Sequence, residues 1–465
     1  MDALHELSAV ELAAALRAGD VDPQRATDHY LARIARHEAL GAFAEVTPEA
    51  ARERAAQLAA SPPSGPLWAL PHADKDLVAR AGVATRYGSR ARAAHVPTVS
   101  DPLAAAVDAA GAVSVGKTAT SEFGLTGFTE PLTSRPARDP WNTAHGAGGS
   151  SGGAAVAVAA GLLPLAIGSD GGGSIRIPAA TVGVVGLKPS RGRLPIGSGF
   201  DAPDGLAVTG PLARTAEDAA FLLDALVGLA PFRYATGAPG SGPFLDAARR
   251  DPARGRVGVT LTSPWDDDED IRLDPAARAA VDAAAGWLAG DGQSVEEFDW
   301  RPQGYPALFR VLWRASAARI PLSAHDMQTV EPLTAWLVAE GRALPATRLL
   351  DALAAARAFE RATIEAFSPY DAVLTPALAQ SPRPVGAYAG QDPERTFAMQ
   401  VEYAPYSSYV NVAGLPALTV PVTRAADGHP VSVQLVGRPG GEATLLALAA
   451  QLERRRGPLP HPPLW

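Results

Sequence analysis

Two clusters of glycine and serine lie close together in the first half of the chain, GGSSGG at 148–153 and DGGGS at 170–174. Glycine permits unusual backbone angles and lets a ligand approach the main chain closely, and successive N–H groups in such a turn can converge on an anion. A serine that ends such a turn combines an exposed hydroxyl with neighbouring N–H donors. Acyl transfer requires both, the hydroxyl as the nucleophile and the N–H groups as its oxyanion hole. Phosphate binding and tight packing could use the same clusters, so these residues alone leave three interpretations open.

Lysine is scarce in this sequence. Only three of the 41 basic residues are lysines, namely Lys75, Lys117 and Lys188. Arginine stays protonated at any ordinary pH, whereas a buried lysine can lose its proton and act as a base. Each lysine is therefore a candidate for a task that arginine cannot perform. The alternative is that the lysines are simply solvated residues that remain by chance in an arginine-rich composition.

The elements that must position these residues are predicted from local patterns. Ser8 and Glu11 match a capping box, and Asp22-Pro23 and Thr47-Pro48 match helix starts, so the N-terminal segment is predicted to be helical. From residue 71 onward, short apolar segments alternate with glycine-rich turns and alanine-rich helices, which indicates an α/β protein with a buried sheet. The predicted strands are 112–115, 165–167, 182–187, 256–260, 372–374, 417–422 and 431–436. The predicted helices beyond the N-terminal segment are 215–227, most of 274–367 and 441–455, and 231–255 is predicted to be a loop or linker.

Strand-forming segments lie on both sides of the long helical stretch. This pattern predicts one large, twisted, mixed β-sheet flanked on both sides by helices, with the N-terminal helices packed outside. We expect a single domain over 1–465. Within it, 1–65 is a helical segment, 66–230 and 368–465 form the sheet core with both glycine-serine clusters, and 231–367 is a mostly helical insertion.

Bulk composition argues against several classes of protein. The absence of cysteine excludes disulfides and a cysteine nucleophile, and a formal net charge of −8 argues against a broad electropositive surface for nucleic acid. The first residues lack the basic start and apolar run of a signal peptide, and the most apolar stretch, 152–167, contains Pro164 and is short for a membrane span. The histidines show no metal-binding spacing. We expect a cytoplasmic protein with no metal, cofactor, nucleic-acid or membrane partner.

A nucleotide-binding motif competes for one segment. GAVSVGKT at 111–118 matches GxxxxGK[ST], which needs a strand before its first glycine and a helix after its last residue. Here an alanine-rich helix is predicted before the motif, and AVSV itself is predicted to be the strand. Lys117 is therefore interpreted as structural.

An α/β-hydrolase elbow competes for another segment. GGSSG at 148–152 matches GxSxG with Ser150 as the nucleophile. That fold needs an acidic residue and then a histidine further along the chain. The histidines that follow, His325, His429 and His461, lie in no convincing loop motif, which disfavours this interpretation.

The order GGSSGG, a helix, DGGGSIRIPA and GVVGLKP resembles the signature of the amidase signature family. Further similar segments are ADKDLV at 73–78, VGKTATSEFG at 115–124, NVAGLPALTVPV at 411–422 and VSVQLVGRPGGEATLL at 431–446. The resemblance is weak between about 231 and 369. It implies the fold of that family and an enzyme that hydrolyses the C–N bond of a small-molecule amide, and a homodimer is compatible with it.

Carried over onto this sequence, the resemblance makes Ser174 the nucleophile, Ser150 a relay that follows a cis peptide bond, and Lys75 the base. Neutral Lys75 would take a proton from Ser150, which would take one from Ser174, and water would later hydrolyse the acyl-enzyme. The resemblance implies an oxyanion hole built from the N–H groups of Gly171, Gly172, Gly173 and Ser174.

Three further residues are expected to support the site. Asp170 and Arg176 flank the nucleophile, and we expect them to pair and hold the turn without taking part in the chemistry. Ser151 is expected either to hydrogen-bond the catalytic residues from behind or simply to fill space.

Two positions depart from the family pattern. Asp74 stands where an apolar residue is usual, and an acid beside Lys75 would oppose its role as a base. In a strand, however, Asp74 points away from the face that carries Lys75, so the assignment is kept. Gly171 stands where Thr or Ile is usual, which leaves the acyl-side wall of the site open to question.

Aromatic residues in the poorly matched region are expected to wall the substrate pocket. Phe309, Trp313 and Trp336 would suit an apolar or aromatic acyl group, with core packing as the alternative. Ester, hydrazide and carbamate cleavage on the same fold stay open. A glutamyl- or aspartyl-tRNA amidotransferase A-type subunit is a further alternative, but that subunit usually carries Gln where this chain has Ile177. Retention of all three polar catalytic positions argues against an inactive binding protein.

Overall fold

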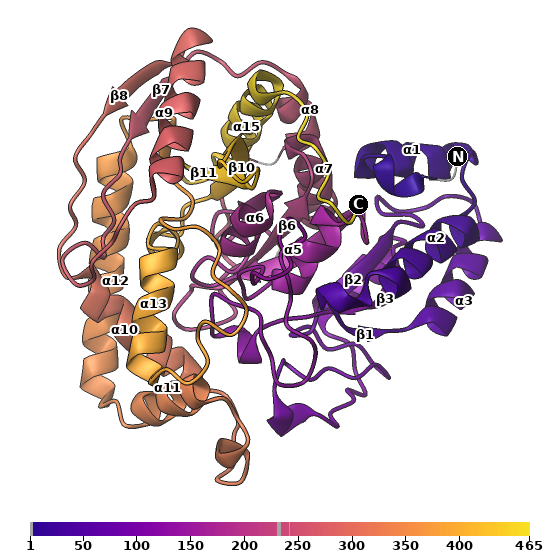
Figure 1. The fold of residues 1–465 in the computed structure, drawn as a ribbon, viewed down its shortest axis with the longest axis horizontal. Coiled ribbons are helices and arrows are strands. Elements are labelled where there is room, and N and C mark those ends of the chain that lie inside the picture. The colour runs from indigo at the N-terminus through magenta and orange to yellow at the C-terminus, as the bar shows by residue number, and fades with distance from the viewer. Residues whose placement is uncertain (1–2, 230–233, 241) are drawn as a thin grey trace.

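The strands of this protein form two separate sheets, as the computed structural model of residues 3–229, 234–240 and 242–465 shows (Figure 1). The larger sheet has the strand order β4-β6-β5-β10-β11-β9-β7-β8, and the smaller has the order β1-β3-β2. The strands of the larger sheet are β4 (Leu165–Asp170), β5 (Val185–Lys188), β6 (Val208–Ala213), β7 (Arg256–Val259), β8 (Ser294–Glu297), β9 (Ala372–Pro376), β10 (Ala417–Arg424) and β11 (Pro430–Gly437). Those of the smaller sheet are β1 (Phe43–Val46), β2 (Pro71–Lys75) and β3 (Val113–Thr118).

The larger sheet is mixed, which confirms the sequence-based prediction. Neighbours from β4 through β9 run antiparallel, whereas β9, β7 and β8 run parallel to one another. Strands from before and after the helical stretch at 274–367, and β8 from within it, therefore join one sheet.

The helices surround these sheets. Their bounds are α1 (Ala9–Ala18), α2 (Pro23–Arg36), α3 (Pro48–Ala59), α4 (Pro102–Ala109), α5 (Gly152–Ala159), α6 (Arg176–Val182), α7 (Ala216–Val227), α8 (Phe244–Arg249), α9 (Pro275–Gly290), α10 (Tyr305–Ala318), α11 (Pro332–Arg342), α12 (Ala346–Phe367), α13 (Pro393–Tyr403), α14 (Ser408–Val412) and α15 (Glu442–Arg456).

Helices cover both faces of the larger sheet. Val433 and Leu435 of β11 belong to the apolar core that includes α7, α9 and α15. Gln434 points to the opposite face, where its side-chain oxygen accepts a hydrogen bond from Arg176 of α6. A second apolar core holds α10, α11 and α12 together, and these helices gather at the opposite side of the molecule from α1–α3 (Figure 1). Alternation along the strands thus separates an apolar face from the face that supports the glycine-serine clusters.

Local signals placed the N-terminal helices correctly. Ser8 accepts from the N–H of Glu11, and the Glu11 carboxylate accepts from the N–H of Ser8, which completes the capping box of α1. Asp22 caps α2, which begins at Pro23. Each cap satisfies N–H groups that a helix start leaves unpaired.

Other boundaries differ from the predictions. The predicted strand 182–187 is divided, because α6 ends at Val182 and Gly183 adopts a left-handed φ of 74° before β5 begins. The predicted loop at 231–255 contains α8 in its described part, while residues 230–233 and 241 lie outside the described residues. Strands β1, β6 and β8 were not predicted.

The missing prediction of β6 has a clear physical reason. Its sequence contains Gly210-Pro211, which is typical of a turn. The segment is nevertheless a strand paired on both sides, with β4 from Val208 to Ala213 and with β5 at Leu212 and Ala213.

None of the helices in the described ranges combines the length and the apolar character that crossing a bilayer requires.

Candidate active site

Lys75 ends strand β2 and reaches one of the predicted catalytic serines. Its Nζ lies 2.7 Å from Ser150 Oγ and 3.1 Å from Ser169 Oγ, and only 2% of the residue is exposed. Burial lowers the pKa of Lys75 from 10.5 to about 7, although the negative charge of Asp170 opposes this change. Near neutral pH, a large part of the Lys75 population is therefore uncharged and able to accept a proton.

The other two lysines are placed differently. Lys117 lies in β3, where its Nζ donates to Thr85 Oγ1 at 3.2 Å and to the carbonyl of Val78. Lys188 is 1% exposed and donates to the carbonyl of Pro189 at 2.8 Å. The GKT of the nucleotide-like motif is thus part of a strand, with Lys117 bound to the main chain.

Asp74 does not face Lys75. Its carboxylate lies 2.6 Å from Arg80 Nε and 3.3 Å from His72 Nε2. Burial would raise the pKa of Asp74, but the hydrogen bonds and charges of His72 and Arg80 hold it below its usual range. The acid beside Lys75 in the sequence is thus neutralised on the other face of β2.

The loop before α5 fixes Ser150. The Gly149–Ser150 peptide bond is cis, and the Ser150 carbonyl accepts from Thr129 Oγ1 at 3.3 Å and from the Ser121 N–H at 3.4 Å. A Cβ on Gly149 would lie 2.6 Å from the main chain of Phe128, so only glycine fits immediately before this serine.

Ser151 connects the two glycine-serine clusters. Its N–H donates to the Ser174 carbonyl at 3.1 Å, and its hydroxyl donates to the Ser169 carbonyl at 3.3 Å. Because both contacts involve the strand and turn that carry Ser174, Ser151 fixes the position of the first cluster relative to the second.

An ion pair supports the turn that carries Ser174. Asp170 and Arg176 are paired at 2.9 Å, and both side chains are at most 1% exposed. The carboxylate of Asp170 also accepts from the N–H groups of Gly173 and Ile175, at 2.7 and 3.1 Å, and from the Asn411 amide at 2.9 Å. Burial opposes ionisation, but the charge and hydrogen bonds of Arg176 hold the pKa of Asp170 well below its usual range. The turn is therefore built around a carboxylate that is ionised near neutral pH.

The N–H groups of this turn are not equivalent. The N–H of Gly173 already donates to the Asp170 carboxylate, so it is not free to donate to an oxyanion. Within the described part of the chain, no acceptor pairs with the N–H groups of Gly171, Gly172 and Ser174.

Ser174 opens into a pocket of about 510 Å³. Phe309 and Trp313 are among its walls, with their rings stacked 5.5 Å apart, and Trp313 Nε1 donates to the carbonyl of Leu125 at 3.3 Å. No described residue that lines the pocket is charged. The lining residues are Leu125, Thr126, Gly127, Gly172, Ser174, Ile177, Trp265, Phe309, Trp313, Phe397, Gln400, Val401, Ala404 and Ser408.

Trp336 does not line this pocket. Its ring lies 4.7 Å from the guanidinium of Arg314, on the neighbouring helix α10. The prediction for Trp336 is therefore corrected: helix α11 directs this ring against Arg314 of α10, and the ring is not among the walls of the pocket at Ser174.

Several residues of the site were not predicted from sequence. Ser169 contacts Lys75, Asn411 holds Asp170, and Trp265 and Phe397 line the pocket. Ser169 immediately precedes the DGGGS cluster, which is the one signal that could have indicated it. Trp265 and Phe397 lie in segments that reach the site only through tertiary folding.

The histidines that follow GGSSG in the chain lie outside the pocket at Ser174. His325, His429 and His461 are absent from the lining of the pocket at Ser174, so the elbow interpretation of GGSSG lacks its base. No group of three His, Asp or Glu side chains suited to a metal ion occurs among the residues that the structure describes.

A family model described as Amidase matches residues 25–446. The chain therefore belongs to the amidase signature family and is an amide hydrolase. It is 40% identical over 397 residues to the “Putative amidase AmiB2” of Mycobacterium tuberculosis, covering 84% of this chain and 82% of that protein. It is 35% identical over 465 residues to a “Putative amidase” of Synechocystis sp., covering 97% of this chain and 88% of the relative. The solved structure of 6-aminohexanoate cyclic dimer hydrolase matches with a TM-score of 0.88 at 28% identity, over 99% of both chains.

Proposed function

We propose that this amidase cleaves its substrate through an acyl-enzyme on Ser174, with Ser150 as proton relay and Lys75 as base. The observation that carries the proposal is the 2.7 Å separation of Lys75 Nζ from Ser150 Oγ, combined with a buried lysine whose pKa is lowered to about 7. A lysine in this state can accept a proton at the pH at which most enzymes work.

In the first half-reaction, Ser174 Oγ attacks the carbonyl carbon of the amide. The Ser174 proton passes to Ser150 Oγ, and the Ser150 proton passes to Lys75 Nζ. The carbonyl oxygen becomes an oxyanion that the N–H groups of Gly171, Gly172 and Ser174 can stabilise. The tetrahedral intermediate then collapses, the leaving nitrogen takes a proton returned through Ser150, and the free amine departs.

In the second half-reaction, water attacks the ester that joins the acyl group to Ser174. The proton lost by water travels along the same route to Lys75, and its return to Ser174 Oγ releases the carboxylic acid. The enzyme ends each cycle in its starting protonation state, so the scheme requires no metal or cofactor.

The pocket supports a preference for uncharged, apolar or aromatic acyl groups. A charged acyl group would lose its hydration here without gaining a partner, since no charged side chain among the described residues lines the pocket. The stacked rings of Phe309 and Trp313 offer a flat apolar surface instead.

The mechanism is tested with a panel of anilides assayed with wild type, Ser174→Ala and Ser150→Ala, together with intact-mass analysis of quenched reactions. We expect an acyl adduct on Ser174 in wild type, and a loss of turnover of at least about 1,000-fold in Ser174→Ala. Activity that survives Ser174→Ala but disappears in Ser150→Ala would make Ser150 the nucleophile and refute the scheme. Thermal unfolding of each variant checks that it is folded.

The substrate preference is tested by comparing phenylacetyl, hexanoyl, acetyl and succinyl anilides. We expect kcat/KM to be highest for the phenylacetyl and hexanoyl compounds and lowest for the charged succinyl compound. Trp313→Ala should reduce kcat/KM for the phenylacetyl compound, whereas the matched control Trp336→Ala, which removes an indole outside the pocket, should not. A succinyl compound that is cleaved best would contradict the proposal.

A further inference from the structure

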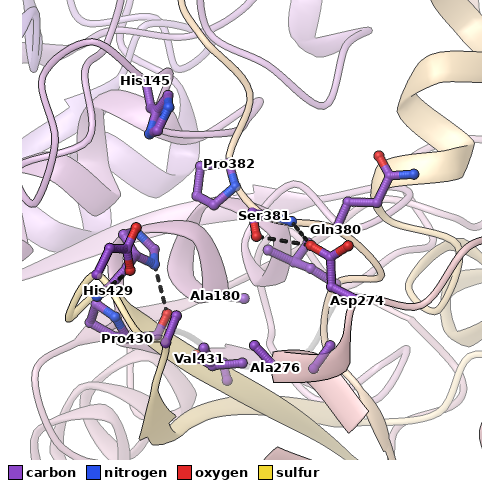
Figure 2. Close-up of a pocket in the computed structure, with 15 residues that line it drawn as sticks. His145, Ala180, Asp274, Ala276, Gln380, Ser381, Pro382, His429, Pro430 and Val431 are labelled. Carbon is purple, nitrogen blue, oxygen red and sulfur yellow. Dashed lines mark hydrogen bonds between the residues drawn. The ribbon is translucent and has the colours of Figure 1, made fainter.

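Figure 2 shows a second pocket, of about 590 Å³. Its walls come from the loop at His145, α6, the start of α9, the segment after β9, the hairpin that joins β10 to β11, and the start of β11. Lys75, Ser150 and Ser174 are not among its lining residues. Those residues are His145, Ala180, Asp274, Ala276, Ala277, Leu378, Gln380, Ser381, Pro382, Ala425, Asp427, His429, Pro430, Val431 and Ser432.

A buried hydroxyl in this pocket has no partner. Ser432 of β11 is 5% exposed, and its Oγ makes no hydrogen bond within the described ranges of the chain. A buried polar group without a partner costs free energy, and most such groups in folded proteins are satisfied. Ser432 therefore offers one unused polar contact to a molecule in the pocket.

Asp274 offers a second unused contact. It is the residue immediately before α9, yet its side chain caps no N–H of that helix. One carboxylate oxygen, Oδ2, instead accepts from the N–H and hydroxyl of Ser381, at 2.7 and 2.8 Å, as the dashed lines in Figure 2 show. The other oxygen, Oδ1, accepts no hydrogen bond from any described residue.

The charge of the lining is negative. His429 lies across the pocket from Asp274 (Figure 2), and its Nε2 is 2.7 Å from Asp139 while its Nδ1 is 2.9 Å from the carbonyl of Pro430. Burial opposes protonation of His429, but the hydrogen bond and charge of Asp139 raise its pKa above the ordinary value. His429 is therefore compensated by Asp139 and lies beside Asp427, whose carboxylate accepts from the His429 N–H at 3.0 Å and whose charge also raises the pKa of His429. Asp274 remains without a cationic partner among the described residues that line the pocket.

The remaining surface of the pocket is apolar. Ala180, Ala276 and Val431 lie together below the polar groups, and Pro382 lies above them (Figure 2). Small side chains leave room for the body of a ligand, and their apolar surface gains from being covered. A bare metal ion does not suit this environment, because the described residues contain no group of three ligating side chains.

We propose that this pocket binds a small organic ammonium ion with a short apolar body. The carboxylate of Asp274 receives the ammonium group, the body lies against Ala180, Ala276 and Val431, and the Ser432 hydroxyl hydrogen-bonds to a polar atom of the ligand. The site uses none of the groups assigned to catalysis, so its existence does not depend on the proposed mechanism.

The probe is n-butylammonium, titrated calorimetrically into the Ser174→Ala protein, with n-butanol and butanoate as matched neutral and anionic probes. We expect saturable binding of n-butylammonium, and affinities for the other two probes that are lower by about tenfold or more. Equal binding of all three probes, or binding of butanoate alone, would overturn the proposal.

Three further substitutions locate the site. Asp274→Asn should weaken n-butylammonium binding by about tenfold, while Asp282→Asn, which removes the same charge from an exposed position of α9, should leave it unchanged. Ala276→Leu fills the pocket without touching the Asp274–Ser381 contacts and should abolish binding. If n-butylammonium binds normally to Ala276→Leu, the ligand lies elsewhere and the assignment is wrong.

Discussion

Replacement of Lys75 by arginine tests the central element of the proposed chemistry. The substitution keeps a long, cationic side chain in the same place but removes the ability to lose a proton near neutral pH. With its pKa lowered to about 7, Lys75 is neutral in about half of the molecules at pH 7, whereas a lysine with the ordinary value of 10.5 would be neutral in about 0.03% of them. Burial thus raises the population of the competent base by roughly 1,500-fold.

The sign of the pH dependence follows from the same value. Because the base is the neutral form, kcat/KM of the wild type should rise with pH, with a midpoint near 7, and level off above it. Lys75→Arg should lower the plateau by about 1,000-fold, within the range expected for the loss of a general base. Its residual activity should show no midpoint near 7.

The assay is the initial rate of anilide hydrolysis at low substrate concentration, measured between pH 5.5 and 9.5 at constant ionic strength. Lys75→Met, measured in parallel, separates the loss of the base from any effect of the retained positive charge. If Lys75→Arg keeps more than about a tenth of the wild-type activity, or keeps the midpoint near pH 7, another group is the base and the reasoning is refuted.

Three further predictions concern stability and specificity. Lys75→Met should raise the free energy of unfolding at pH 7 by about 1–4 kcal/mol, because the folded-state pKa of Lys75, about 7, lies below its unfolded value of 10.5. This gain in stability should be largest below pH 7 and should disappear above about pH 10.5, which urea unfolding at several pH values can measure. Asp170→Asn should lower the free energy of unfolding by about 3 kcal/mol, since it leaves the buried Arg176 uncompensated; an unchanged urea midpoint would contradict this role. Gly171→Val should reduce kcat/KM for the phenylacetyl anilide more than for the acetyl anilide, because a Cβ at Gly171 lies 3.6 Å from the ring of Trp313; equal losses for both substrates would show that Gly171 does not shape the pocket.

Sequence reasoning located the polar centre of the site better than its walls. The glycine-serine clusters and the rare lysine are local signals, and the structure brings Lys75, Ser150 and the Ser174 turn together. Phe309, Trp313 and Trp336 were all predicted to wall the pocket. Phe309 and Trp313 do line it, but Trp336 does not, because helical periodicity cannot say which neighbouring helix a side chain will face.

The separate three-stranded sheet could not be predicted, for a related reason. Strand β1 pairs with β3 across about seventy residues of chain, and β2 pairs with β3 through a helix-containing connection. No local pattern specifies which strands of an α/β chain share a sheet, so the sequence-based scheme assigned every strand to a single one. The hydrogen bond from the Gly173 N–H to Asp170 could not be predicted either, because it depends on the backbone conformation of a turn of three glycines.

The proposed base ends a strand of the smaller sheet, whereas the proposed nucleophile lies in a turn that follows a strand of the larger one. Lys75 is the last residue of β2, and Ser174 follows β4. Strands β2 and β4 contact each other, but they are not paired by the hydrogen bonds of a sheet. Catalytic activity therefore depends on how the two sheets are positioned relative to each other, and circular dichroism is insensitive to that positioning. A denaturant concentration that partly unfolds the smaller, N-terminal sheet but not the larger one should abolish activity while most of the fold persists.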